Sequence, residues 1–128
     1  MKRIQILFFI VVMALSFSQG CKKYVPIENQ NVSTAHHSLK IMQEGILEGC
    51  RTSGWTAKVM SPQNIEAVLR LRSHIATVRI PFTENGYSIN YKDSVNLTKD
   101  GKIHQNYEGW ILRLRNNIDF SINSKAHN

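Results

Sequence analysis

A small set of histidine, serine, asparagine and tyrosine side chains carries the chemistry that this sequence could perform. A histidine beside a serine, with an asparagine to orient the imidazole ring, is an arrangement that supports nucleophilic catalysis. Residues of these types occur near position 74 and between positions 91 and 107, and they could converge at one end of a sheet. The candidates for this polar site are His74, Tyr91, Ser94, Asn96, His104, Asn106 and Tyr107.

These residues also have a structural interpretation, which we favour. Asn96 and Asn106 can bond loop backbone and cap a helix, while tyrosine and histidine side chains satisfy the polar edge of a core. The sequence contains no nucleophile elbow or other catalytic signature. We therefore assign no catalytic residue. The alternative is a small periplasmic hydrolase or cell-wall enzyme that uses His74 or His104.

Metal binding has little support. His36, His37 and Glu44 could be taken for ligands, but adjacent positions on a helix point in different directions and cannot chelate from one face. The two cysteines, Cys21 and Cys50, lie far apart in the sequence and do not form the clustered pairs of a zinc site. We expect no metal and no other cofactor.

The first 20 residues have the order of a secretory signal peptide. Lys2 and Arg3 precede an unbroken apolar run from Ile6 to Leu15, and small residues follow it. The run is too short for a membrane-spanning helix, which needs about 20 apolar residues. We therefore expect residues 1–20 to be a signal peptide and the remaining chain to be exported.

The chemical state of Cys21 determines whether the exported chain is anchored to a membrane. Ser18-Gln19-Gly20-Cys21 resembles the bacterial lipoprotein cleavage box, in which the cysteine becomes the acylated first residue. Several acyl chains on one residue would anchor the protein stably. We expect a lipid anchor at Cys21 and a flexible tether over residues 21–32. If Cys21 is a free thiol, the alternative is a disulfide with Cys50, which the periplasm permits.

The net positive charge of the chain limits the kinds of molecule that it is expected to bind. The chain has a formal net charge of +7, and removal of Lys2 and Arg3 leaves 14 basic against 9 acidic residues. This excess suits an anionic envelope surface, while export argues against a nucleic-acid partner. Lys22 stands where the lipoprotein resemblance associates aspartate with inner-membrane retention, so the outer membrane is favoured.

Alternating apolar and polar residues predict a four-stranded antiparallel meander between Trp55 and Tyr91. The strands are separated by turn sequences, of which Asn85-Gly86 is the strongest hairpin signal. Aligning the strands places their apolar residues on one face, with Lys58 and Arg79 opposite Glu66 on the other face. Opposite charges at facing positions support this alignment.

The expected pairing around the last hairpin is specific. A turn at Asn85-Gly86 sets Phe82 opposite Ile89. In that register the missing N–H of Pro81 faces the second strand close to where that strand begins. Proline is therefore tolerable inside this strand.

A helix is expected on each side of the meander. Ser33 or Thr34 can cap the first, which runs to about Arg51. The second begins between Ile103 and Tyr107, and Gly109 would let it pack closely against the sheet.

The predicted fold is therefore α+β, in the order α-β-β-β-β-α, with both helices on one face of the sheet. It forms a single domain over residues 33–122, followed by a disordered tail at 123–128.

The outer sheet face is the leading candidate for binding. It would display Lys58, Arg70, Arg79 and Lys92 against Glu66 alone. Such a face suits an envelope protein or an anionic envelope polymer. Our leading hypothesis is a non-catalytic, lipid-anchored accessory protein that binds its partner through this face.

Short motifs between Arg51 and Ile118 also carry a family likeness. They are Gly54-Trp55, Arg72-Ser73-His74, Ala76-Thr77-Val78, Ile80-Pro81, Tyr87-Ser88-Ile89, Tyr91, Ser94, Asn96-Leu97, Ile103-His104, Asn106-Tyr107 and Trp110. In these the chain resembles a group of small, uncharacterised proteobacterial envelope lipoproteins. The resemblance implies one small domain at the envelope, and it implies no activity.

Overall fold

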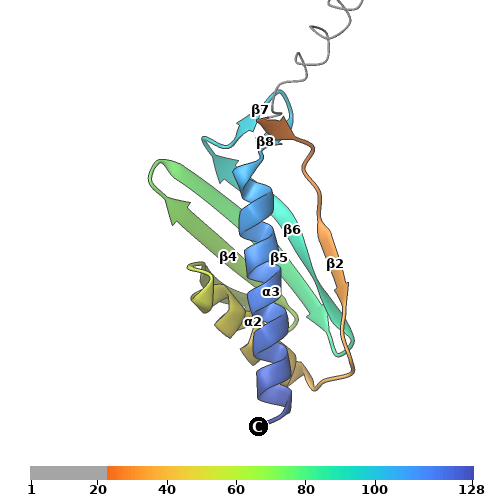
Figure 1. Ribbon diagram of the computed structural model, residues 1–128. Helices are drawn as coiled ribbons and strands as arrows, with labels where there is room; N and C mark the ends of the chain where they lie inside the picture. Colours follow the sequence, from red (N-terminus) through yellow and green to blue (C-terminus); the bar gives the residue numbers. More distant parts are fainter. Residues whose placement is uncertain (1–22) are drawn as a thin grey trace, which may run out of the picture.

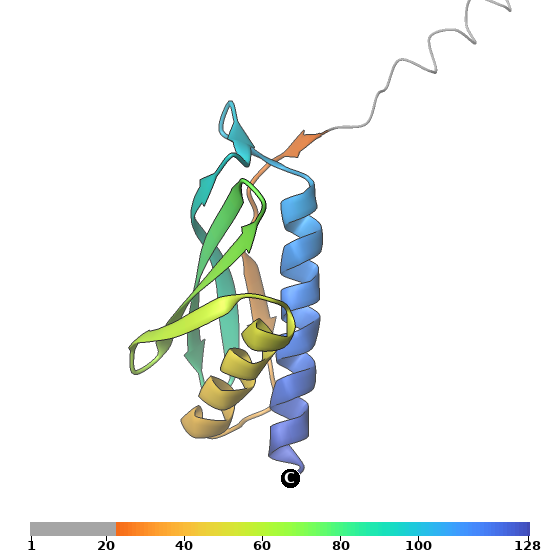
Figure 2. The same ribbon diagram turned by 90° about the vertical axis from the view of Figure 1, so that its left-hand side faces the viewer.

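The computed structural model describes residues 23–128, which form two helices and two β-sheets (Figure 1). Both helices cover the same face of the larger sheet and leave its other face bare (Figure 2). The expected signal peptide and the expected lipidation site, Cys21, lie outside the described residues. None of the helices in the described part of the chain is long and apolar enough to cross a membrane.

The larger sheet has five antiparallel strands in the order β2-β6-β5-β4-β3. These are β2 (Gln30–Ser33), β3 (Thr56–Ser61), β4 (Asn64–Leu71), β5 (His74–Thr83) and β6 (Gly86–Val95). The smaller sheet has three strands in the order β1-β8-β7. These are β1 (Tyr24–Val25), β7 (Thr98–Lys99) and β8 (Lys102–His104). The helices are α2 (Leu39–Thr52) and α3 (Asn106–Ala126).

The prediction of a single four-stranded meander is therefore wrong. Strand β2 adds to β6 as a fifth strand, with Val32 opposite Tyr87. Strand β1 pairs with β8, so the predicted flexible tether over residues 21–32 is wrong from Tyr24 onward. Strand β2 has a single large apolar residue, Val32, and two amide side chains. A segment of this kind shows too little alternation to be recognised as a strand.

The first helix begins later than expected. Ser38 is its N-cap, and the Ser38 Oγ accepts a hydrogen bond from the backbone N–H of Ile41 at 3.2 Å. Ser33 instead closes β2, and the N–H of Thr34 donates to the carbonyl of Asn85 at 2.9 Å. That bond holds the segment before the helix against the β5–β6 turn.

Helix α3 continues to Ala126, so the prediction of a disordered tail at 123–128 is wrong for most of its length. The reason is tertiary, because the last turns of the helix pack against α2. Ile122 is only 1% exposed and lies against Gly45. The buried side of α3 consists of Tyr107, Ile111, Leu114, Ile118, Ser121 and Ile122.

Gly109 was expected to let the last helix pack closely against the sheet, but it does not face the sheet. Gly109 is exposed, and a Cβ atom added there would meet nothing within 4 Å. The close approach occurs at Gly45 and Gly49 of α2, which contact the backbone of Ile122 and Ile118. The two helices therefore meet through α2 glycines.

The registers of the larger sheet are correct in part. Lys58 and Arg79 both lie opposite Glu66, as the charge pattern predicts. Phe82 lies opposite Tyr87 and not opposite Ile89, so that pairing is wrong by two residues. A shift of two residues keeps each side chain on its own face, because the side-chain period of a strand is two.

The same shift changes the environment of Pro81. The N–H of Phe82 donates to the carbonyl of Gln63 at 3.0 Å, toward the β4 side of β5. Alternate residues of a strand bond to opposite neighbours. At Pro81, the side of the backbone that lacks an N–H therefore faces β6. The expectation that it faces the second predicted strand, which is β4, is wrong.

Candidate functional site

The bare face of the larger sheet carries an ion pair at its centre. Lys92 Nζ lies 2.6 Å from Glu66 Oε2, and only 22% of the Glu66 side chain is exposed. Lys58 and Arg79 flank Glu66 on the neighbouring strands. Of the four cations expected on this face, Lys92 is therefore the one that Glu66 neutralises.

A β-bulge at Lys92 adds a second acid to this face. Tyr91 pairs with Val78, and Asp93 pairs with Thr77, so Lys92 is the extra residue on β6. A bulge reverses the alternation of the residues after it. Asp93 consequently shares the outer face with Thr77, and the expectation that Glu66 is the only acid there is wrong.

Three cations on this face keep their charge accessible. Among residues 23–128, the salt bridges join other groups, and none involves Lys58, Arg70 or Arg79. All three side chains are exposed. An apolar row lies next to one of them, because Ile75 and Val95 continue across β5 and β6 from Arg70. Val95 is 47% exposed.

The predicted polar site divides into separate groups, the first of which joins two loops. His74 Nδ1 lies 2.7 Å from the carbonyl oxygen of Asn96, and Asn96 Nδ2 donates to the carbonyl of Ser73 at 3.1 Å. Asn96 has a positive φ of 57°, a conformation that asparagine tolerates better than most residues. These contacts fasten the β4–β5 turn to the chain that leaves β6.

The second group contains Tyr91, Ser94 and Tyr107. The hydroxyls of Tyr91 and Ser94 are hydrogen bonded at 2.8 Å, and the ring of Tyr107 meets the Tyr91 ring edge to face at 6.0 Å. Burial raises the pKa of Tyr107, with a further contribution from Tyr91. Ser94 reaches Tyr91 because the bulge turns it toward the core side of β6.

The third group surrounds His104. Its Nδ1 accepts a hydrogen bond from the backbone N–H of Asn106 at 3.2 Å, and Tyr24 packs against its ring edge to face. Asn106 is the first residue of α3, and Gln105 is the N-cap position without a side-chain bond. The expected capping role of Asn106 is therefore wrong, and His104 satisfies this end of the helix.

The three groups have structural partners and do not form a nucleophile–base pair. Within the described residues, no histidine nitrogen is hydrogen bonded to a serine, threonine or cysteine side chain. The same part of the chain contains no cluster of three or more metal-ligating side chains. What these contacts do is hold loops and a helix terminus in place.

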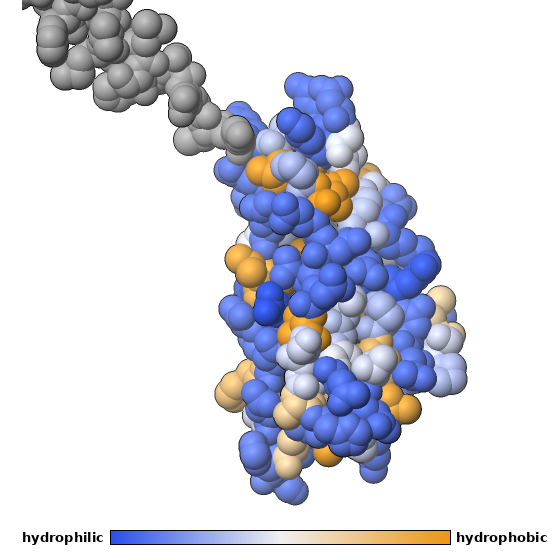
Figure 3. Space-filling model, turned by 90° about the vertical axis from the view of Figure 1, so that its right-hand side faces the viewer, coloured by the Kyte–Doolittle hydropathy of each residue, from blue (hydrophilic) through white to orange (hydrophobic). Residues whose placement is uncertain are grey.

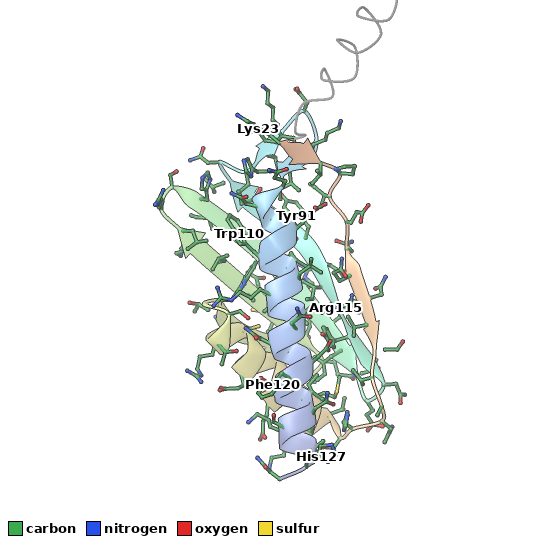
Figure 4. All side chains as sticks on the ribbon, viewed as in Figure 1. Lys23, Tyr91, Trp110, Arg115, Phe120 and His127 are labelled. Carbon is green, nitrogen blue, oxygen red and sulfur yellow. The ribbon has the colours of Figure 1, made fainter. Side chains whose placement is uncertain are left out.

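Cys50 belongs to the core. Its side chain is fully buried in α2, and burial raises the pKa of its thiol to about 12. A thiol with a raised pKa is a poor nucleophile at neutral pH. Lys23, which follows Cys21 closely in the sequence, lies at the end of the molecule away from α2 (Figure 4). The alternative disulfide joins Cys50 to Cys21, which lies outside the described residues.

Sequence reasoning missed a cationic cleft of about 390 Å³ beside the sheet. It lies between the end of α2, the end of β4 and the side of α3. Its arginines, Arg51, Arg70 and Arg113, come from three different elements, so no local spacing could have identified it. Trp55 and Trp110 form its apolar part.

Sequence reasoning also missed the cationic end of the molecule. Lys23, Lys99 and Lys102 are exposed in and beside the three-stranded sheet, where Asp100 is the nearby acid. Lys99 Nζ lies 6.0 Å from the centre of the Tyr24 ring. Figure 4 shows Lys23 at the end of the molecule opposite His127.

Comparison of the sequence with known protein families finds no matching family model, and no curated protein matches it. The function is therefore inferred from the surfaces themselves.

Proposed function

We propose that this protein is a non-catalytic accessory protein of the bacterial envelope. A lipid on Cys21 anchors it to the periplasmic side of a membrane, for which we favour the outer membrane. The outer face of its five-stranded sheet docks an acidic surface of another envelope protein. The resemblance of residues 51–118 to small envelope lipoproteins supports the location.

The single observation that carries the docking proposal is the set of accessible cations on the bare sheet face. Lys58, Arg70 and Arg79 have no carboxylate partner in the described part of the chain. They lie beside the partly exposed apolar row of Ile75 and Val95. Charge complementarity steers protein association, while an apolar centre contributes to its affinity.

A protein partner fits this face better than a polyanion. The Glu66–Lys92 pair and the added carboxylate of Asp93 reduce its positive charge, and a polyanion would be repelled by both acids. A partner protein can place carboxylates at the cations only. The side formed by β2 and α3 is a weaker candidate, because its apolar residues are scattered among polar ones (Figure 3).

The proposed anchor also positions the domain. Strand β1 begins at Tyr24, so little chain separates Cys21 from the three-stranded sheet. The lysines at that end would then lie at the lipid headgroups, where each basic residue contributes about 1 kcal/mol of attraction to an anionic surface. The larger sheet extends away from this end and stays accessible (Figure 1).

The proposal is tested by crosslinking in cells. A photoreactive amino acid at Thr77, at the centre of the outer face, should capture one reproducible envelope protein. Lys58→Glu combined with Arg79→Glu should abolish that crosslink. Lys40→Glu, a matched charge reversal at an exposed position of α2, should retain it.

Three outcomes would contradict this function. The first is the absence of a reproducible protein adduct from Thr77. The second is recovery of a polysaccharide in place of a protein, with the same dependence on Lys58 and Arg79. The third is that the His104→Ala variant fails to replace the unmodified protein in cells although the crosslink still forms. That result would favour the hydrolase alternative.

A further inference from the structure

The cleft beside the sheet has a cationic lining. Among residues 23–128, none of those that line the cleft is acidic, and three of them are arginines. Its volume of about 390 Å³ lies within the lower part of the range typical of ligand sites. Its charged and apolar lining includes Arg51, Arg70, Arg113, Trp110 and Leu71.

Two of the three guanidinium groups are available to an incoming anion. Arg51 is paired with Glu48 through two hydrogen bonds, one of them 2.9 Å long. Arg70 and Arg113 are exposed, and within residues 23–128 neither is joined to a carboxylate. A guanidinium binds a carboxylate through two parallel N–H···O bonds, which gives direction as well as attraction.

The cleft also contains an open stretch of strand edge. The β3–β4 ladder ends at Thr56 and Val68, whereas β4 continues to Leu71. No backbone hydrogen bond joins residues 53–55 to residues 69–71 in this part of the chain. By the alternation of bonding along β4, the backbone N–H and C=O of Arg70 point toward this open side. An extended peptide can pair with such an edge.

Apolar surface completes the cleft. Leu71 is 42% exposed at its rim, and Trp110 is half-buried on the side of α3 toward β4 (Figure 4). An extended peptide presents alternate side chains to opposite sides. A bound segment would therefore turn some side chains to the α3 side, where Arg113 and Trp110 lie, and the others to the outer side of β4, where the side chain of Arg70 lies. Carboxylates on both sides of the segment would each meet an arginine, and apolar side chains on the α3 side would lie against Trp110 and Leu71.

We propose that this cleft binds an extended, carboxylate-bearing peptide segment. The segment forms backbone hydrogen bonds with Arg70, as a strand does, and its carboxylates bind the guanidinium groups of Arg70 and Arg113. The inference deepens the proposed function, on which it rests, because it names the element of the acidic partner that is recognised. The outer face would then hold the body of the partner, and Arg70 would connect the two surfaces.

The test uses the purified full chain in detergent and a fluorescein-labelled peptide that repeats glutamate–glutamate–valine, so that acids lie on both of its sides, and binding is measured by fluorescence anisotropy. Arg113→Glu should weaken binding by at least about tenfold, since a hydrogen bond to a charged group is lost and a repulsion is added. Lys40→Glu should bind as the unmodified chain does. A lysine–valine peptide of the same length should not bind.

The proposed backbone hydrogen bonds between the peptide and Arg70 have a separate test. Replacing the central valine by proline should weaken binding, because proline cannot donate to the strand edge. Equal binding of the glutamate peptide by the unmodified chain and by Arg113→Glu would overturn the proposal. Binding of free succinate as tightly as the peptide would also overturn it, because no extended segment would then be needed.

The proposals for the outer face and for the cleft can be tested independently. Arg79 lies on the outer face and does not line the cleft, whereas Arg113 lines the cleft and lies on α3. Arg79→Glu should abolish the crosslink from Thr77 and leave peptide binding unchanged. If the unmodified chain does not bind the peptide although the crosslink from Thr77 forms, the cleft alone is rejected. If the unmodified chain binds the peptide but gives no crosslink, the outer face alone is rejected.

Discussion

Gly49 of α2 lies so close to Ile118 of α3 that a Cβ atom at Gly49 would stand 2.5 Å from the Cα of Ile118. Gly45 meets Ile122 in the same way, one turn earlier in α2 and one turn later in α3. Small residues four positions apart let two helix backbones approach closely. The packing of both helices over the sheet depends on this contact.

We therefore expect Gly49→Ala to lower the free energy of unfolding by about 1–3 kcal/mol, because backbone of α3 would have to move. Gly109→Ala is the matched control, since its added methyl group would meet open space. That substitution should raise the stability by ~1 kcal/mol through helix propensity alone. Urea denaturation measures both. Equal effects of the two substitutions would show that the helix contact is not tight.

A second prediction concerns the bond between the sheet and α3. The hydroxyl of Tyr87 donates to Asp119 Oδ1 at 2.6 Å. Tyr87→Phe leaves a half-buried carboxylate without this donor, so we expect a loss of about 1–3 kcal/mol in unfolding free energy. Asp119→Asn keeps an acceptor and should lose less. A Tyr87→Phe variant as stable as the parent would show that water replaces the hydroxyl.

A third prediction follows from buried groups that resist ionisation. Burial raises the pKa of the Cys50 thiol from about 9 to about 12. Burial and the neighbouring Asp119 also raise the pKa of Tyr87 above its usual range. The folded state therefore holds protons that the unfolded chain releases. Its stability should be complete below pH ~9 and fall above it, by up to ~1.4 kcal/mol per pH unit for each group.

Urea denaturation across the alkaline range checks this dependence. Cys50→Ala should flatten the decline between pH about 9 and about 12, although its stability at neutral pH is lower because a buried side chain is truncated. Within the native state the thiol should also resist maleimide until urea unfolds the chain. Rapid labelling of Cys50 in the native state would contradict its burial.

The fourth prediction concerns the cationic end of the molecule. Lys99→Ser combined with Lys102→Ser should weaken attraction to an anionic membrane by about 2 kcal/mol at low salt. Sedimentation of the Cys21→Ser chain with phosphatidylglycerol vesicles measures this effect without the proposed lipid. Phosphatidylcholine vesicles and a Lys40→Ser variant are the controls. Unchanged sedimentation with phosphatidylglycerol would show that this end does not contact headgroups.

Much of the larger sheet could be predicted from the sequence, because alternation of side chains is a local property. The apolar sides of β3, β4 and β5 follow directly from it, and Glu66 lies between Lys58 and Arg79 as the charges require. Even the incorrect pairing of Phe82 leaves its side chain in the core. A pattern with a period of two tolerates register errors of two residues.

The candidate sites could not be predicted to the same extent. The sequence left open whether His74, Tyr91 and His104 converge, and in the structure each bonds a different partner. The bulge at Lys92 gives no signal in the sequence, and it decides which face Asp93 and Ser94 occupy. One inserted residue reverses every position that follows it.

Local patterns of this sequence therefore determined which segments alternate, which side chains enter the core and where most strands lie. The tertiary structure alone decided that β2 joins β6, that two glycines of α2 meet α3, and that Arg51, Arg70 and Arg113 surround one cleft. The physical reason is that periodicity specifies the buried side of a segment, whereas the choice of neighbour depends on how the whole chain closes its core.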